Sequence, residues 1–231
     1  LVAMYQFNIV FGILVAFLSN YLIGQFLGTE GWRWMLGIEA LPAIIYTLMV
    51  TGVPNSPRWL LAQKNEEDKA TGVLQQLNPS FSKEEIQAEL VAIKASLVQK
   101  VGDNFLSGRY NKSILLAFFL AFFNQASGIN FVLYYAPRIF ESAGIASDSV
   151  LGASIPIGVV NLVFTLLGMY LIDKLGRKQL MIIGSLGYIF TLLGVAWAFY
   201  TQAEGIMVVT FVAFFVGAHA IGQGAVIWVF I

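Results

Sequence analysis

Side-chain amides recur within long apolar stretches of this chain, where a polar group needs a specific partner. Moving an amide into hydrocarbon without a hydrogen bond costs on the order of a few kcal/mol, so such residues are considered functional first. Because amides both donate and accept hydrogen bonds, several together suit a neutral, hydroxyl-rich ligand better than an ion. The polar residues inside these stretches are Gln6, Asn8, Asn20, Glu39, Asn124, Gln125, Asn130, Asn161, His219 and Gln223.

The densest polar group is the segment Asn124-Gln125-Ala126-Ser127-Gly128-Ile129-Asn130. Gln125 and Asn130 are five residues apart, which is about 140° around a regular helix, so an unbroken helix directs them to different faces. A break at Gly128 brings them together, and broken helices are tolerated at membrane depth where they line a cavity. The alternatives are that Gly128 only permits close packing and that the amides only join neighbouring helices.

Aromatic and imidazole side chains near these amides each have two interpretations. Tyr134 and Tyr135 fit either an interfacial aromatic belt or a gate over a cavity. The flat ring of Trp228 fits either stacking against sugar C–H groups or anchoring at the membrane surface. His219 can carry protons near neutral pH or serve as a hydrogen-bonded packing residue. The carboxylate of Glu39 has no evident cationic partner in the sequence.

Several kinds of chemistry are excluded by the residues that the chain lacks. It has no cysteine, so disulfides, thiol catalysis and thiolate zinc sites are ruled out. No nucleophile is paired with a base, no metal cluster or phosphate loop occurs, and no cofactor is expected. The 13 basic and 13 acidic residues cancel, which gives no sign of a nucleic-acid partner. An enzyme is therefore the class of protein least expected.

The elements that must position these residues are transmembrane helices. Of the 231 residues 58% are hydrophobic and only 11% are charged. This charged share is less than half of what a water-soluble domain usually carries. A stretch of roughly 20 apolar residues spans the hydrocarbon core of a bilayer. The sequence thus predicts an all-α membrane protein with six spans, at about 3–26, 34–53, 113–136, 149–172, 179–200 and 206–231.

A charged segment, 54–112, separates the second span from the third and is predicted to hold short amphipathic helices outside the membrane. Ser82 and Glu85 have the spacing of a helix N-terminal capping box. Apolar residues then recur at intervals of three and four, at Ile86, Leu90, Ile93 and Leu97. Eleven Lys and Arg residues, Lys100 and Arg109 among them, lie in this segment and in the 173–178 turn, so both are predicted to be cytoplasmic.

Three motifs together resemble the sugar porters of the major facilitator superfamily, along essentially the whole chain. Residues 124–130 with Tyr134-Tyr135-Ala136-Pro137 look like the family's Q-Q-x-S-G-x-N and Y-Y segment. Pro54-Asn55-Ser56-Pro57-Arg58-Trp59-Leu60 is similar to its P-E-S-P-R-W-L motif, although Asn55 replaces the glutamate. Asp173-Lys174-Leu175-Gly176-Arg177-Lys178 looks like its D-x-x-G-R-R/K turn.

The resemblance implies a partial major facilitator bundle containing the fifth to tenth of twelve helices. Residues 1–53 would end the N-terminal half, 54–112 would form the cytoplasmic helical linker, and 113–231 would begin the C-terminal half. Apolar runs reach both Leu1 and Ile231, so the chain is expected to be an internal piece of a longer protein. Its partners would be membrane lipid and the missing helices, and its location the plasma or inner membrane.

The implied function is monosaccharide transport by alternating access, with a pentose or hexose as substrate and proton symport as the expected coupling. A transporter-like sensor that binds sugar without moving it is the alternative. The resemblance implies sugar contacts at Gln6, Asn124, Gln125, Asn130, Asn161 and Trp228. Asn124 stands where the family has a longer glutamine, and His219 where it often has an aromatic sugar neighbour. Gly224-Ala225 lacks the proline of the family's G-P-x-x-W motif.

Charged residues at the cytoplasmic turns complete the prediction. Arg58, Asp173, Arg177 and Lys178 are candidates for ion pairs that form when the inside is shut and separate when it opens. The simpler interpretation is that they only determine topology. Tyr134 and Tyr135 are the corresponding candidates for a gate at the opposite end.

Overall fold

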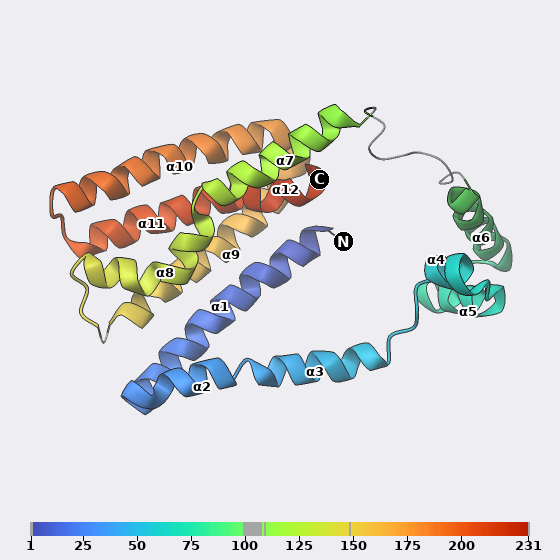
Figure 1. The fold of residues 1–231 in the computed structure, drawn as a ribbon, viewed down its shortest axis with the longest axis horizontal. Coiled ribbons are helices and arrows are strands. Elements are labelled where there is room, and N and C mark those ends of the chain that lie inside the picture. The colour runs from blue at the N-terminus through green and yellow to red at the C-terminus, as the bar shows by residue number, and fades with distance from the viewer. Residues whose placement is uncertain (1, 99–107, 109, 148, 231) are drawn as a thin grey trace. The chain divides into compact units, whose positions relative to one another are not determined.

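The computed structural model describes residues 2–98, 108, 110–147 and 149–230, and these residues form helices and connecting turns without strands. The chain divides into two compact units, each described here by itself. The first consists of Leu1–Gly37 and Lys112–Ile231, and the second of Ile38–Asn111 (Figure 1). Lys100 and Arg109, which the topology prediction counted, lie outside the described residues.

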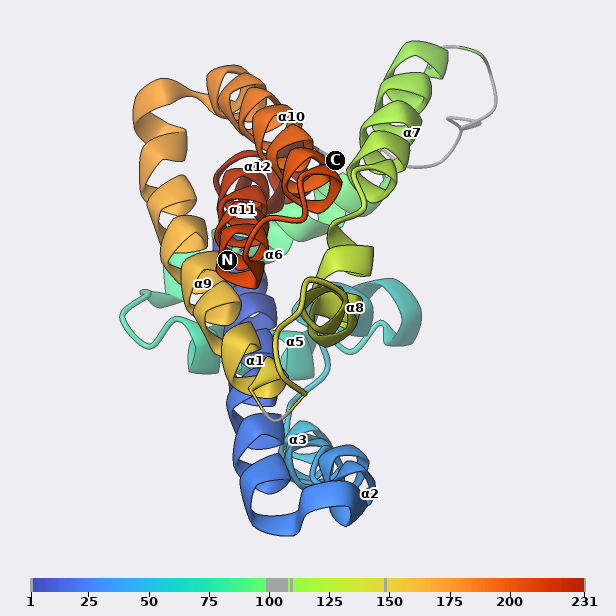
Figure 2. The same cartoon turned by 90° about the vertical axis from the view of Figure 1, so that its left-hand side faces the viewer.

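The first unit is built from long apolar helices joined by short turns. Its elements are α1 (Val2–Leu27), a 3-10 turn η1 (Gly28–Glu30), α2 (Gly31–Gly37), α7 (Asn111–Ala126), α8 (Ile129–Ser142), α9 (Val150–Leu175), α10 (Arg177–Tyr200), α11 (Gly205–His219), a π-helical turn η3 (Ala220–Gly224) and α12 (Ala225–Phe230). Helices α10 and α11 run side by side in Figure 1, and in Figure 2 α9 lies against α1 and α11.

Glycines allow these helices to approach closely. A Cβ atom on Gly158 of α9 would lie 3.0 Å from Phe17 of α1, so the helices meet here without room for a side chain. A Cβ on Gly184 of α10 would lie 2.6 Å from the Cα of Gly222 in η3. Small residues that bring backbones together are the usual means of joining helices in lipid, where hydrophobic burial gives little driving force.

Six helical stretches in the described residues are long and apolar enough to cross a membrane, as predicted. They are Met4–Leu27, Gly31–Thr51, Asn111–Ser142, Val150–Leu175, Arg177–Tyr200 and Gly205–Ile227. Large apolar side chains cover much of their outer surface, for example Phe26 and Phe190. Such exposure suits lipid as the solvent, whereas a water-soluble monomer rarely exposes contiguous apolar area on this scale.

The second unit contains α3 (Ala40–Thr51) followed by the helices of the charged segment. These are α4 (Pro57–Trp59), a π-helical turn η2 (Leu60–Lys64), α5 (Glu67–Leu77) and α6 (Lys83–Val98). The Glu39 carboxylate is exposed at the position before α3, where a two-residue turn interrupts the second span.

The predicted capping box and amphipathic pattern are both confirmed in α6. The backbone N–H of Ser82 donates to Glu85 Oε2 at 2.7 Å, and the N–H of Glu85 donates to Ser82 Oγ at 3.2 Å. Ile86 and Leu90 are buried, with Ile93 and Leu97 packed against them. Lys94 Nζ also lies 2.5 Å from Glu67 Oε2, joining α6 to α5 on their exposed side. Because every apolar position of the repeat faces the same small core, these helices pack on one another as amphipathic segments.

Candidate functional site

A cavity of about 330 Å³ lies within the first unit, and residues from α1, α7, α8, α9 and α11 to α12 surround it. Five of the seven polar side chains that line it in the described part of the chain are amides. The described residues that line it are Tyr5, Gln6, Ile9, Val10, Ile13, Asn124, Gln125, Ile129, Asn130, Leu133, Asn161, His219, Ala220, Gly224 and Ile227. Elements far apart in sequence thus place neutral hydrogen-bonding groups around a space of small-molecule size.

The break predicted at Gly128 is present and forms one side of this cavity. Helix α7 ends at Ala126, Gly128 has φ = 80°, and α8 begins at Ile129. Figure 1 shows α7 and α8 as two separate helices. Glycine adopts this left-handed conformation without the steric cost that a Cβ imposes. Asn130 Nδ2 consequently donates to Gln125 Oε1 at 2.8 Å. The interruption therefore brings together two amides that an unbroken helix would separate.

Asn161 reaches the cavity from the buried face of α9. This face repeats at helical spacing, and Asn161 is only 6% exposed on it. On α7, the Oδ1 atom of Asn124 is buried and has no hydrogen-bond partner among the described residues. Buried polar groups usually find a partner, so this enclosed carbonyl oxygen is an acceptor that the described residues around it leave unsatisfied.

His219, together with Ala220 and Gly224 of the π-helical turn, forms a further part of the wall. His219 is 8% exposed, and its Nδ1 is buried without a partner in the described part of the chain. A Cβ atom on Gly224 would lie 3.5 Å from Gln6 Nε2 and 3.4 Å from the carbonyl oxygen of His219. The turn therefore approaches α1 so closely that a larger residue at Gly224 would fill the space between them.

Five of the six predicted binding residues line this cavity: Gln6, Asn124, Gln125, Asn130 and Asn161. The backbone at Trp228 continues α12, but its side chain lies outside the described part of the chain. Of the other polar residues, Gln223 hydrogen-bonds Tyr188 instead.

The sequence missed Tyr5 and the apolar part of the wall. Tyr5 immediately precedes Gln6 in α1, but only the packing shows which face of an apolar helix borders the cavity. Neither residue type nor spacing in α1 distinguished Ile9 and Ile13 from the residues that face lipid.

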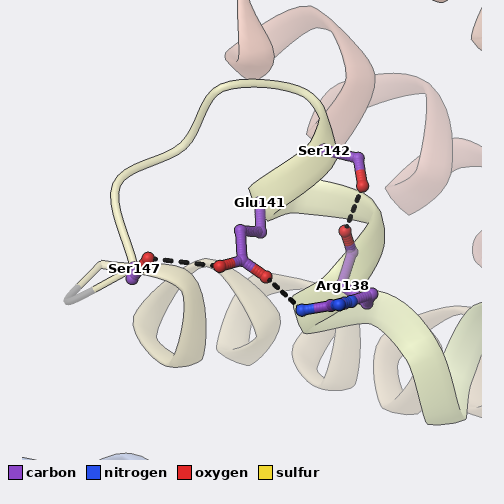
Figure 3. A network of polar contacts seen from close by, with 4 residues as sticks. All are labelled: Arg138, Glu141, Ser142 and Ser147. Carbon is purple, nitrogen blue, oxygen red and sulfur yellow. Dashed lines mark hydrogen bonds and ion pairs between the residues drawn. The ribbon is translucent and has the colours of Figure 1, made fainter.

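A polar network joins the C-terminal end of α8 to the loop that leads into α9 (Figure 3). Arg138 Nη1 donates to Glu141 Oε2 at 3.0 Å, and Ser147 Oγ donates to Glu141 Oε1 at 3.3 Å. Ser142 Oγ donates to the carbonyl oxygen of Arg138 at 2.8 Å. Tyr134 and Tyr135, the predicted gate residues, border a shallow pocket beside this network. Both tyrosines are exposed. Their role as a gate remains a prediction.

The predicted cytoplasmic latch residues fall in different parts of the structure. Arg58 lies in α4 of the second unit, where Ser56 Oγ accepts the backbone N–H of Trp59 at 3.2 Å. Asp173 lies near the end of α9, and Arg177 and Lys178 begin α10. The left-handed residue Gly176, with φ = 80°, forms the corner between these helices. Pairing between Arg58 and this corner remains a prediction.

Six helical stretches of the described residues are long and apolar enough to cross a membrane, and four of them contribute residues to an amide-lined cavity of small-molecule size. These features define a multi-pass membrane protein. Comparison with known families then gives the assignment. The family described as "Sugar (and other) transporter" matches residues 1–231. The chain belongs to this family of multi-pass membrane transporters, as its three motifs predicted, and so it is not an enzyme.

Characterised relatives agree with that assignment. The D-xylose-proton symporter of Escherichia coli is 37% identical over 99% of this chain and 47% of its own length. The arabinose-proton symporter of Bacillus subtilis is 32% identical over 99% of this chain and 50% of its own length. The chain therefore spans about half the length of the relatives that it matches.

Solved structures show the same fold. A partially occluded, inward-open structure of the xylose transporter XylE from E. coli superposes with a TM-score of 0.84, at 35% identity, over 98% of this chain and 48% of that one. A structure of the same symporter bound to 6-bromo-6-deoxy-D-glucose superposes with a TM-score of 0.78 at 37% identity, over 99% of this chain and 48% of that one. The fold class predicted from the sequence, a partial major facilitator helical bundle, is confirmed.

Proposed function

We propose that this chain provides the central six helices of a monosaccharide transporter, and that the cavity of about 330 Å³ is part of its sugar site. The observation that carries the proposal is the convergence of five amides from α1, α7, α8 and α9 on one space. A hydroxyl both donates and accepts, and so does an amide, so each amide can bond a sugar hydroxyl in either direction.

The rest of the wall also fits a sugar. Ile9, Val10, Ile13 and Leu133 give the cavity apolar surface against which the C–H face of a sugar ring can pack. The described lining residues include no Asp, Glu, Lys or Arg, so a strongly charged substrate has no counter-ion there. A pentose or hexose combines neutrality, hydroxyl groups and small size, and it is the substrate class that this wall favours.

Transport would proceed by alternating access. Residues 1–53 would close the N-terminal half of the bundle, 54–112 would form the cytoplasmic linker, and 113–231 would begin the C-terminal half. The two halves would rock about the sugar site and open it to each side in turn. Arg58, Asp173, Arg177 and Lys178 would hold the cytoplasmic side shut, and Tyr134 and Tyr135 would cover the other. Trp228 would complete the sugar site from α12.

Proton coupling is the transport mode that we propose. It rests on the relatives, two of which are described as proton symporters for xylose and arabinose. Uptake of radiolabelled D-xylose into proteoliposomes by the full-length protein, with and without an inward proton gradient, tests it. Stimulation by the gradient supports symport, equal uptake indicates facilitated diffusion, and binding without flux would establish a sensor.

Gln125→Ala tests the site directly. It removes the acceptor of the Asn130 hydrogen bond together with one cavity amide. We therefore expect D-xylose affinity to fall at least tenfold, more than the loss of one net neutral hydrogen bond of about 1 kcal/mol would cause. Isothermal titration calorimetry of the purified full-length protein measures the change. Asn8→Ala is the matched control, because Asn8 is an exposed amide of α1 that does not border the cavity. Unchanged affinity in Gln125→Ala would exclude the assigned site.

A further inference from the structure

The π-helical turn Ala220–Gly224 interrupts the sixth span where that span forms a wall of the cavity. Its first and last residues, Ala220 and Gly224, both line the cavity, and so does His219 immediately before it. A π-helical turn inserts about one residue into an α-helix, which rotates everything beyond it by about 100°. The orientation of Gly224 and Ile227 toward the cavity therefore depends on keeping this turn.

A side-chain hydrogen bond joins the turn to α10. Gln223 is 6% exposed, and its Nε2 atom donates to the hydroxyl oxygen of Tyr188 at 2.6 Å. The Tyr188 hydroxyl in turn donates to Ser185 Oγ at 3.2 Å. The ring of Tyr188 is held independently, because it packs edge-on against Phe215 of α11 with centroids 6.2 Å apart. Gln223 thus bonds a rigid partner on another helix, and such bonds fix helix pairs in membranes.

Close backbone contacts between the turn and α10 constrain the position of the turn together with this hydrogen bond. The approach of Gly184 to Gly222 leaves no space for a side chain, and a Cβ atom on Gly187 would lie 2.7 Å from the Cβ of Ala218. Rewinding 220–224 into a regular α-helix would change which residue faces α10 and put a side chain where Gly222 now lies. The Gln223 bond and the glycine contact therefore select the same conformation of the turn.

Residue 225, which follows the turn, explains why a side-chain hydrogen bond is needed to stabilise the turn. Proline at position 225 would remove a backbone donor and disfavour a regular helix by itself. Ala225 keeps its N–H, which bonds the carbonyl oxygens of Ala220 and Gly222. The backbone alone thus leaves a continuous helix accessible, and the interruption relies on contacts with α10.

We infer that Gln223 and Tyr188 form a positioning pair, whose hydrogen bond holds the π-helical turn in the conformation that directs Gly224 and Ile227 into the sugar cavity. Neither side chain of the pair is among the described residues that line the cavity, so the pair acts through the wall. The inference rests on the proposed function, since it assigns the pair a role in how tightly and how selectively that cavity binds a monosaccharide.

A double-mutant cycle on the full-length protein tests the pair. Gln223→Leu, Tyr188→Phe and the double variant are titrated by calorimetry with D-xylose and with D-glucose. We expect each single variant to weaken D-xylose binding about fivefold, the equivalent of one net hydrogen bond, and to change the xylose-to-glucose affinity ratio. Because both changes remove the same bond, the double variant should bind no more weakly than either single one. Tyr170→Phe, at an exposed tyrosine near the end of α9, is the control and should bind normally.

Three results would overturn the inference: unchanged affinity in either single variant, multiplicative losses of about 25-fold in the double variant, or fewer binding sites per protein at an unchanged dissociation constant. The last result would mean that the bond only maintains folding. Gln125→Ala, titrated in parallel, separates the two proposals. If it abolishes binding while the pair variants bind normally, only the positioning role fails, and if the unmodified protein binds neither sugar, both proposals fail.

Discussion

Neutral amides supply most of the hydrogen-bonding groups of the cavity. How tightly they can bind a ligand depends on how many of these groups are not already bonded to the protein. The Asn130 amide already donates to Gln125, which orients both groups. Asn124 Oδ1 and His219 Nδ1 are buried without partners among the described residues. The wall of the cavity thus combines an organised amide pair with enclosed polar atoms that the described residues leave unsatisfied.

His219 provides a residue-scale prediction. His219→Phe keeps a planar ring but removes a buried nitrogen that lacks a partner in the described part of the chain. Leaving such an atom unsatisfied costs about 1–3 kcal/mol. We therefore expect the variant to raise the apparent melting temperature of the purified protein in the absence of sugar. Differential scanning fluorimetry in detergent measures this, and a lower melting temperature would show that the imidazole has a stabilising partner.

At the scale of the helices, two breaks determine which residues come together at the cavity. Helix α7 gives way to α8 at Gly128, and α11 gives way to α12 through the π-helical turn. Both interruptions border the cavity, where irregular backbone is tolerated because it does not face lipid. The motif around Gly128 made the first break predictable. The second was missed, because no proline occurs in this part of the sequence and the turn contacts α10 through Gln223 with Tyr188 and through Gly222 with Gly184, which are tertiary contacts.

Gly128→Ala tests the first break. A Cβ atom at Gly128 would meet no atom beyond the adjoining residues within 4 Å, so the substitution acts through the positive φ of 80°. This left-handed conformation costs an L-residue about 1–2 kcal/mol. We expect a shift toward a continuous helix, separation of Gln125 from Asn130 and at least a fivefold loss of D-xylose affinity, measured by calorimetry.

Gly12→Ala is the control for that experiment. Gly12 lies inside α1, an added methyl group would meet no atom within 4 Å, and its φ is not positive. Alanine favours a helix over glycine by about 1 kcal/mol, so binding should be retained and stability kept or slightly raised. Equal losses of affinity in both variants would refute the role of the backbone conformation at Gly128.

At the scale of the whole molecule, the distribution of charge predicts the orientation of the chain in the membrane. Basic residues concentrate in the 54–112 segment and in the 173–178 turn, whereas the turn before α11 carries Glu204 and no basic residue. In short loops, Lys and Arg keep a segment on the cytoplasmic side. The 54–112 segment, whose described helices share a small apolar core, is the longest stretch of the chain between two spans.

Single cysteines at Glu84 and Glu204 test this topology, since the 231 residues contain no native cysteine and both side chains are exposed. In right-side-out vesicles, a membrane-impermeant maleimide should label Glu204→Cys and leave Glu84→Cys unlabelled. Inside-out vesicles should give the reverse. Labelling of both positions from the same side would contradict the predicted orientation.

The sequence by itself determined the membrane spans, the capped amphipathic helix α6, the break at Gly128 and five amides of the cavity. Each depends on local composition or on spacing along one element, which a single sequence contains. The tertiary structure decided which faces of α1 and α11 border the cavity, the π-helical turn, and the bond from Gln223 to Tyr188. In helices that are apolar on every side, periodicity does not distinguish faces, so only the fit of one helix against another selects the residues that meet.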